Sequence, residues 1–336
     1  MGANNSTSFG DISPRTAAYA AKDLLKRAIP SLVLELFGQA KVLPANSSKT
    51  ITWRKFTALD TTPAVLTEGV TPTSQVLSTT DVTVTLQQLG SVVTITDVVM
   101  DTHEDPVLQE SIDLLGEQAA QMVERMRYGQ LRAGTNVVYA NGASRAAVNT
   151  TITLAVQRKV TRSLKRQNAE QITKVVRSTP NFGTEPVAKS FIGLCHTDLE
   201  SDLRNMLGAD GKIVFVPTEK YGSMTPYASE IGKVEDVRYI TSTIFAPFPD
   251  AGGAKGLMQS TSGVNADVYP ILYIAKHAYG IVALKGAFGI TPTVVNPKPS
   301  DSDPLAQRGK VGWKSMQAAV ILNDQFLVRA EVAATA

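Results

Sequence analysis

The sequence contains a single cysteine, Cys195, and three histidines among its 336 residues. A lone cysteine excludes an internal disulfide framework and is typical of a protein from a reducing compartment. No apolar run approaches the roughly 20 residues that a membrane-spanning helix needs. The first residues are polar and lack the basic-then-apolar order of a secretory signal. These absences predict a soluble, intracellular, globular protein with no membrane partner.

Sequence motifs of common enzymes are missing as well. The chain has no phosphate-binding glycine loop that ends in Gly-Lys-Ser/Thr, no nucleophile turn of the Gly-x-Ser-x-Gly kind, no His-Glu-x-x-His helix and no Cys-x-x-Cys pair. Charged residues make up 19% of the chain and the formal net charge is +3, a balance too even to indicate nucleic-acid binding from bulk charge. The sequence therefore predicts no enzyme activity, no cofactor and no metal site.

Two groups of side chains could nevertheless carry chemistry. Cys195 and His196 are adjacent, as a nucleophile and its base could be, but neighbouring residues of a strand point to opposite faces. A buried structural cysteine is the preferred interpretation. The acidic cluster at residues 101–105 could bind a cation, although its position just before a helix favours capping and compensation of the helix dipole.

Residues 15–43 are predicted to form a helical arm. Alanines and leucines recur at helical spacing opposite a face rich in lysine and arginine, and Pro30 interrupts the helix. A second short apolar piece runs from Leu32 to Phe37. An amphipathic arm must bury its apolar stripe, so we expect it to lie either on its own domain or on a neighbouring subunit.

Residues 49–97 predict two β-strands joined by a long loop. Ile51 and Trp53 alternate with polar residues in the first strand, and Val82 and Val84 do so in the second. The stretch between the strands is polar and contains prolines and a glycine. Because an isolated hairpin is marginally stable, we expect this one to lie on a second surface.

The clearest helix covers residues 106–133. Asp105 is a good N-cap, and Gly134 can end the helix. Such a long helix is typical of a structural spine, and its apolar seam is expected to pack against C-terminal strands near Val320 and Leu322. The seam repeats at spacings of three and four and comprises Leu108, Ile112, Leu115, Ala119, Met122 and Met126.

Residues 151–293 alternate helices with strands and predict an α/β domain. A proline-rich connector then leads to a final strand pair at residues 313–322 and 325–332. One helix of the domain carries basic residues without an intervening acid, and these form either a solvated face or a contact to nucleic-acid phosphates or to acidic residues of a neighbour. They are Arg158, Lys159, Arg162, Lys165 and Arg166.

Five stretches, in this order and spacing, are similar to one known family. They are AKDLLKRAIPSLVLELFGQAKVLPANSSKTITWRKF (21–56), LTEGVTP (66–72), ITDVVMDTHEDPVLQE (95–110), GLCHTDLESDLRN (193–205) and DPLAQRGKVGWKSMQAAVILNDQFLVRAE (303–331). The chain resembles the major capsid proteins of tailed bacteriophages of the Hong Kong 97 type. Within that type it resembles the family typified by the coat protein of phage N four.

The resemblance implies an α+β fold with four parts. These are an N-terminal arm (1–48), an extended β-hairpin loop (49–100), a peripheral domain with the spine helix (101–150 and 294–336) and an axial α/β domain (151–293). The resemblance also implies hexamers and pentamers of an icosahedral shell around double-stranded DNA, assembled in the bacterial host cytoplasm and retained in the virion. Portal, scaffold or decoration proteins would be further partners, and packaged DNA would be contacted without sequence specificity.

The arm and the loop would supply the subunit contacts in such a shell. The founding member of this type joins its subunits covalently through a lysine of the extended loop, whereas no lysine occurs here between Lys55 and Lys159. Two other functions stay open, an intracellular α/β enzyme with its site in residues 151–293 and a subunit of an encapsulin-like compartment. The candidate contact residues are Leu24, Leu32, Phe37, Trp53, Phe56, Leu66, Glu68 and Val70.

Overall fold

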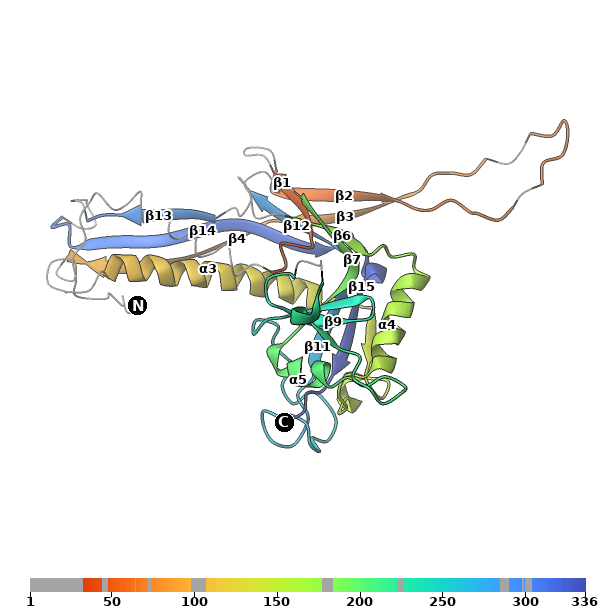
Figure 1. The fold of residues 1–336 in the computed structure, drawn as a ribbon. Helices are drawn as coiled ribbons and strands as arrows, with labels where there is room; N and C mark the ends of the chain where they lie inside the picture. Colours follow the sequence, from red (N-terminus) through yellow and green to blue (C-terminus); the bar gives the residue numbers. More distant parts are fainter. Residues whose placement is uncertain are drawn as a thin grey trace.

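The computed structural model describes residues 33–43, 48–63, 65–71, 74–97, 107–176, 184–222, 226–284, 290–297, 299 and 304–336. These residues form a five-stranded sheet, an eight-stranded sheet and a separate two-stranded hairpin. The five-stranded sheet and a long helix make an elongated layer, the eight-stranded sheet makes a compact body at one end of it, and the hairpin projects beyond that body (Figure 1). The α+β class predicted from the sequence is confirmed.

The five-stranded sheet is built around β14 (Arg308–Ile321). Strand β4 (Gln87–Thr96) runs antiparallel along one edge of β14. On the other edge, β13 (Ile290–Val295) pairs with the first half of β14 and β12 (Tyr279–Leu284) with the second half. Strand β1 (Gln39–Leu43) adds a parallel neighbour to β12. One long strand therefore holds together segments from both ends of the chain.

Helix α3 (Val107–Arg132) lies along this sheet (Figure 1). Its 26 residues make it about 39 Å long at about 1.5 Å per residue. Four residues of the predicted seam, Leu108, Ile112, Leu115 and Ala119, are buried, which confirms the face predicted from their spacing. The strand residues that they pack against are Ile95, Ile290, Val311 and Trp313.

The prediction that the seam packs near Val320 and Leu322 was wrong. Val320 and Leu322 lie at the far end of β14 and pack in a different cluster, which contains Trp53 of the hairpin. Successive residues of a strand point to opposite faces of the sheet. Val311 and Trp313 therefore face α3, whereas Val320 and Leu322 face away from it.

Leu115→Ala is expected to lower the free energy of unfolding by about 3 kcal/mol, because a buried leucine then loses its contacts and leaves a cavity. Leu114→Ala is the matched control, since Leu114 is 63% exposed on the same helix and exposed substitutions usually cost less than about 0.5 kcal/mol. Thermal unfolding of the unassembled protein compares the two. Equal melting temperatures would mean that the seam is assigned to the wrong face.

The two-stranded hairpin consists of β2 (Thr50–Phe56) and β3 (Thr79–Thr85) in antiparallel register. Arg54 and Asp81 face each other across it and form two N–H···O contacts of 2.9 and 2.8 Å. Trp53 is buried at the base of the hairpin, where it packs with residues of the five-stranded sheet. The hairpin is thus anchored at its base.

The eight-stranded sheet forms the compact body. Strand β7 (Thr184–Cys195) pairs antiparallel with β11 (Tyr269–Ile274) and parallel with β10 (Val237–Thr241). Every residue of β10 and β11 is buried, as expected of strands covered on both faces. The other strands are β15 (Leu327–Val332) and β5 (Val137–Tyr139) beyond β11, β9 (Glu230–Val234) and β8 (Val216–Pro217) beyond β10, and β6 (Ile172–Val176) beside β7.

Helices cover the two faces of this sheet differently. Helix α4 (Leu154–Arg166) and the short α5 (Glu200–Arg204) pack on one face. Tyr128 and Leu131 from the last turns of α3 pack on the other face, so α3 belongs to both parts of the molecule. The described chain also contains the 3-10 turns η3 (Arg145–Ala147), η4 (Thr197–Leu199), η5 (Thr218–Lys220) and η6 (Asp324–Phe326).

Several predicted boundaries differ from the strand pairing. Strand β4 was predicted as part of the extended loop and β1 as part of the arm, but both lie in the five-stranded sheet. Strand β12, predicted in the 151–293 domain, lies there too. Strands β14 and β15 were predicted as a pair, yet β15 belongs to the eight-stranded sheet. Alternation identifies a strand but does not identify its partner, and these partners are far apart in the sequence.

Candidate assembly surfaces

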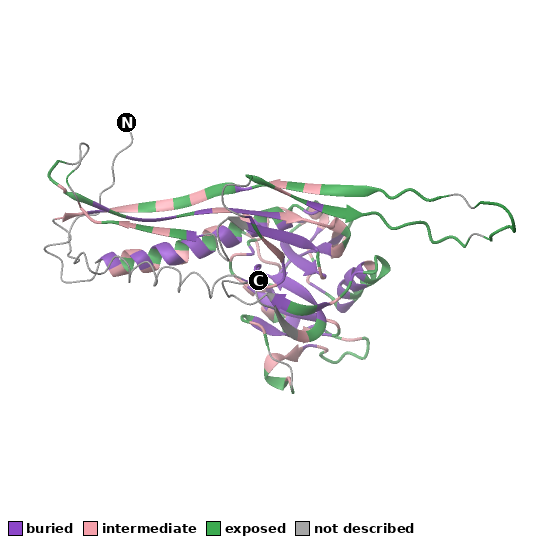
Figure 2. Cartoon of the chain, turned by 90° about the horizontal axis from the view of Figure 1, so that it is seen from above, coloured by how far each residue is buried: buried purple, intermediate pink, exposed green. Residues whose placement is uncertain are grey.

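The chain continues past β2 and β3 as a narrow two-stranded extension, which we call the hairpin loop (residues 57–78; Figures 1 and 2). The Thr57 N–H donates to the Ser78 carbonyl oxygen at 2.9 Å. Farther out, the Gln75 side chain accepts from the Asp60 N–H at 3.1 Å and donates to the Asp60 carbonyl oxygen at 3.2 Å. These bonds continue the register of the strands and direct the loop away from both sheets.

A tight turn closes the apex of the hairpin loop. The Val70 N–H donates to the Thr67 carbonyl oxygen at 3.2 Å. Gly69 lies between them with a φ of +78°, the left-handed conformation that a type II turn places at its third residue. Glu68 is the second residue of the turn and is exposed. The apex therefore presents one carboxylate to solvent.

Apolar residues are among the exposed residues of the hairpin loop, whose described part is coloured as exposed in Figure 2. Val65 is 95% exposed, Leu66 70% and Val70 64%. Leu59, Val76 and Leu77 are exposed as well. Removal of apolar surface from water favours association, and gathered exposed apolar residues mark interaction sites. The hairpin loop is the strongest candidate for a contact surface in the described chain.

Four of the sequence-predicted contact residues are exposed on this hairpin. Phe56, Leu66, Glu68 and Val70 are all exposed, at the end of β2 or in the hairpin loop. Their side chains are accessible to another molecule. Contact with a neighbouring subunit stays a prediction for these four.

Phe37 and Trp53 are largely covered by their own chain, with 6% and 7% of their surface exposed, so contact of either residue with a neighbouring subunit is limited to that surface and stays a prediction. The Phe37 ring meets the Tyr227 ring edge-on, with centroids 5.2 Å apart, and Trp53 lies in the core at the hairpin base. An apolar residue of an internal core and one of an interface look alike in a sequence, so the pattern does not distinguish these two residues from the exposed candidates. Leu24 and Leu32 lie outside the described residues.

Helix α4 presents its cations to solvent. Arg158 Nε donates to Glu235 Oε1 at 3.0 Å, and Lys165 forms an ion pair with Asp236. Both acids lie in the turn between β9 and β10. Two of the five predicted contact cations are thus paired within the chain. The acidic residues that were expected from a neighbouring subunit are, for these two cations, residues of the same subunit.

The other three cations of α4 are Lys159, Arg162 and Arg166. All three are exposed, and no ion pair joins them to a residue that the structure describes. They leave a positively charged stripe on the outer face of the compact body.

The adjacent pair Cys195 and His196 does not form a catalytic dyad. Cys195 is fully buried on β7, and its thiol donates to the Ile240 carbonyl oxygen at 3.7 Å. Burial raises the pKa of the thiol far above its ordinary value, so the thiolate that a nucleophile needs is not formed at neutral pH. His196 Nδ1 accepts from the Asp198 N–H at 3.2 Å and caps turn η4. Both side chains have structural partners.

The acidic cluster at 101–105 lies outside the described residues. In the part of the chain that is described, no group of three or more His, Cys, Asp or Glu side chains is arranged to hold a metal ion. No helix of that part combines the length and apolar character needed to cross a membrane.

Sequence reasoning missed a buried charged group, the junction cluster of Glu35, Glu124 and Arg127. Glu124 Oε1 on α3 accepts from the N–H groups of Val33 and Leu34 at 3.1 and 3.0 Å. Arg127, one helical turn farther on, donates to Glu35 Oε2 at 3.3 Å. The cluster fastens the segment before β1 to the long helix.

Charge in the junction cluster is unbalanced, because two carboxyl groups share one guanidinium in a buried space. Burial raises the pKa of Glu124 to about 7, although Arg127 and the two backbone donors act in the opposite direction. Burial also raises the pKa of Glu35, against the attraction of Arg127. Arg127 makes a further bond to Gln317 Oε1 of β14, at 2.7 Å. The cluster thus joins three segments of the chain.

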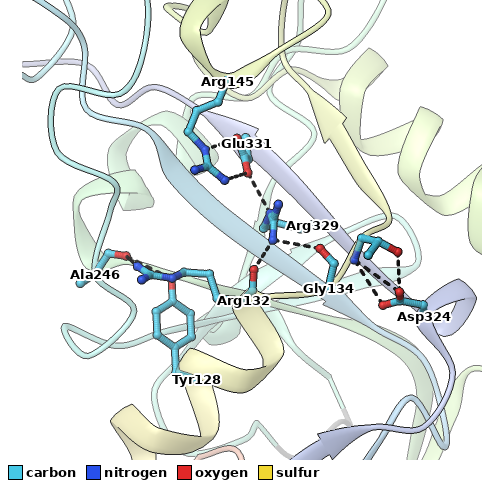
Figure 3. Close-up of polar contacts among 9 residues, drawn as sticks. Tyr128, Arg132, Gly134, Arg145, Ala246, Asp324, Arg329 and Glu331 are labelled. Carbon is cyan, nitrogen blue, oxygen red and sulfur yellow. Dashed lines mark hydrogen bonds and ion pairs between the residues drawn. The ribbon is translucent and has the colours of Figure 1, made fainter.

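A second polar network ties the end of α3 to the eight-stranded sheet (Figure 3). Arg329 of β15 donates to Glu331 Oε1 at 2.8 Å, to the Gly134 carbonyl oxygen at 3.0 Å and to the Arg132 carbonyl oxygen. Arg145 Nε donates to Glu331 Oε2 at 2.8 Å. The last carbonyls of a helix have no partner within the helix, so Arg329 satisfies them and fixes the helix on the body.

About three quarters of the chain matches a known sequence family. Residues 79–330 match the family described as phage capsid protein. The chain belongs to this family. The capsid function predicted from the sequence is thereby confirmed: this chain is a phage capsid protein, and its place is the shell of the virion.

Solved phage capsids share the fold. The capsid of Ralstonia phage GP4 has a TM-score of 0.66 and 12% identity, with 89% of this chain and 87% of that chain covered. The capsid of cyanophage Pam1 has a TM-score of 0.62 and 13% identity, with 92% of each chain covered. The head of Helicobacter pylori bacteriophage KHP40 has a TM-score of 0.53 and 11% identity, with coverages of 88% and 87%. No protein with a curated description matches the chain in sequence.

Proposed function

We propose that this phage capsid protein builds its shell by laying the hairpin loop over a neighbouring subunit. The observation that carries this proposal is the group of exposed apolar residues, among them Val65, Leu66 and Val76, that the fold holds away from both of its sheets. In a single chain these side chains stay in water. Assembly in which each copy covers the loop of another removes that surface from water without any change in the core.

The Hong Kong 97 type and the narrower resemblance to phage N four coat proteins are part of this proposal. The five-stranded sheet with α3 would be the peripheral domain, and the body around the eight-stranded sheet would be the axial domain at the centre of hexamers and pentamers. The shell would assemble in the bacterial cytoplasm and enclose double-stranded DNA. Portal, scaffold and decoration proteins are further proposed partners.

The exposed cations of α4 support a non-specific contact to the packaged DNA. Lys159, Arg162 and Arg166 have no acidic partner among the described residues, and free cations gain most from contact with phosphates. This contact would be independent of the DNA sequence, because cations that neutralise phosphates read no bases.

Shells of this protein are expected to be held without covalent links. No lysine occurs between Lys55 and Lys159, and Cys195 is buried. Mature particles boiled in denaturant should therefore run as one band near 35.9 kDa in gel electrophoresis. A ladder of larger bands that survives reductant would contradict this expectation.

The proposed assembly is tested by expressing the full chain and examining it by sedimentation and negative-stain electron microscopy. Megadalton icosahedral particles are the expected result. A small globular oligomer would contradict the proposal and favour the α/β enzyme. Nuclease-protected DNA in particles from infected cells would separate a phage shell from an encapsulin-like compartment.

A further inference from the structure

A groove with a volume of about 350 Å³ lies at the base of the hairpin. We call it the basal groove. Its lining combines apolar and aromatic side chains with lysines from two strands. The residues that matter here are Lys41, Trp53, Lys55, Val82, Leu322 and Phe326.

The basal groove carries positive charge that the chain does not neutralise. Lys41 Nζ lies 5.1 Å from the centroid of the Trp53 ring, and Lys55 Nζ lies 5.8 Å from the centroid of the Phe326 ring. No ion pair joins either lysine to a residue within the described ranges. The nearby Arg54 is already paired with an acid of β3. The groove therefore fits a ligand that has a carboxylate next to apolar groups.

The apex of the hairpin loop has this composition. Residues 56–80 contain no lysine, arginine or histidine, and their acids are Asp60 and Glu68. Asp60 is exposed as well, but it lies four residues beyond the end of β2, where its Oδ1 accepts from the Thr62 N–H and hydroxyl at 3.0 and 2.8 Å. Glu68 is therefore the acid at the apex. The exposed Leu66 and Val70 flank it.

The apex cannot reach the basal groove of its own chain. Thr67 comes eleven positions after Phe56, and at about 3.3 Å per step an extended segment carries the apex about 36 Å away from the base. The hairpin loop is extended in this direction (Figures 1 and 2). A contact between the two surfaces must therefore join different copies, and a head-to-tail contact of this kind generates rings.

We propose that Glu68 at the apex of one copy docks between Lys41 and Lys55 in the basal groove of the next copy, with Leu66 and Val70 against the apolar lining. This inference rests on the proposed function and names the partner surface of the hairpin loop. The contact sets which copy follows which, because opposite charges attract only in this orientation.

Charge reversal tests the pairing. Glu68→Lys should raise the protein concentration needed for assembly at least ten-fold, and Lys41→Glu with Lys55→Glu should do the same. The triple variant regenerates the pair with reversed signs, so it should assemble like the wild type. Asp60→Lys is the control, because it makes the same change of charge on the same loop. Any assembly defect that it causes should persist when Lys41→Glu and Lys55→Glu are added. Sedimentation of the full-length chains measures each variant, and their melting temperatures check folding.

A carbodiimide joins a carboxylate to an amine only where the two are in contact, with loss of water and without a spacer. In treated wild-type particles, mass spectrometry should find Glu68 joined to Lys41 or Lys55 of another copy. Wild-type assembly without this link, combined with normal assembly of Glu68→Lys, overturns the inference and leaves the proposed function standing. A wild type that does not associate at all overturns both.

Discussion

Deletion of residues 60–78 is expected to abolish shell formation and to leave a folded chain. The deletion joins Leu59 to Thr79, so a short loop of residues 57–59 closes the hairpin while the pairing of Phe56 with Thr79 is kept. The deleted residues belong to none of the hydrophobic cores of the described chain. The variant therefore loses the candidate contact surface and retains the packing that stabilises the subunit.

Two measurements separate assembly from folding in this variant. The thermal unfolding temperature of the unassembled deletion variant should lie within a few degrees of that of the wild type, while sedimentation should detect no shells. The double substitution Val65→Ser with Leu66→Ser keeps the length of the hairpin loop and removes two of its most exposed apolar side chains, which are adjacent in the sequence, so it should weaken assembly without shortening the loop. Normal shells of the deletion variant would refute the role given to the hairpin loop.

The spacing of apolar residues along the sequence predicted the buried face of α3 and the two strands of the hairpin. The seam of α3 follows from apolar residues at intervals of three and four, and its buried members Leu108, Ile112 and Leu115 are those the spacing indicates. The strands of the hairpin follow from alternation in the same way, and their register is symmetric about the turn that joins them. In both cases the information lies within one short segment.

The distribution of strands between the sheets could not be predicted in this way. Gln317 of β14 pairs with Gln87 on one side and with Ala283 on the other, and these residues are far apart in the sequence. Nothing in the alternation of β14 distinguishes these partners from β15, which follows it directly. The sequence therefore suggests domains that follow one another along the chain, whereas each sheet combines strands from distant parts of the chain.

The junction cluster was missed because charged residues on a helix are usually solvated. Glu124 and Arg127 nevertheless share a face with Ala120 and Leu131, at spacings of four, three and four, and all four are buried. The signal was thus an apolar stripe in which two charges occupy positions expected of core residues. Both charged side chains find their partners in the segment before β1, Arg127 in Glu35 and Glu124 in two backbone N–H groups.

Replacement of the guanidinium in this cluster should have the largest effect on stability of any single substitution considered for this chain. Arg127→Met keeps a long apolar side chain but leaves Glu35 and Glu124 buried without a cation. Removing one partner of a buried pair usually costs about 3–5 kcal/mol, so we expect a loss of about 4 kcal/mol near pH 8. Arg125→Met is the matched control, because Arg125 is exposed on the same helix and its replacement should cost less than about 0.5 kcal/mol.

The loss should shrink as the pH falls, and the direction follows from the carboxyl groups. The pKa of Glu124 is raised from 4.5 to about 7 by burial, so its contribution to stability is present below 4.5 and is lost as the pH rises through 7. Without Arg127, whose charge lowers this pKa, the lost range extends to higher pH. Denaturant unfolding at pH 5 and pH 8 should give a smaller penalty for Arg127→Met at pH 5.

The double variant Arg127→Met with Glu124→Gln decides whether charge or packing carries this effect. If the unpaired carboxylate is the cause, the added glutamine restores part of the stability at pH 8, and the penalties of the two single substitutions do not add. If the penalties add and do not change between pH 5 and pH 8, the guanidinium contributes by packing alone. We expect the non-additive result, because Glu124 Oε1 keeps its two backbone donors while the charge that burial disfavours is removed.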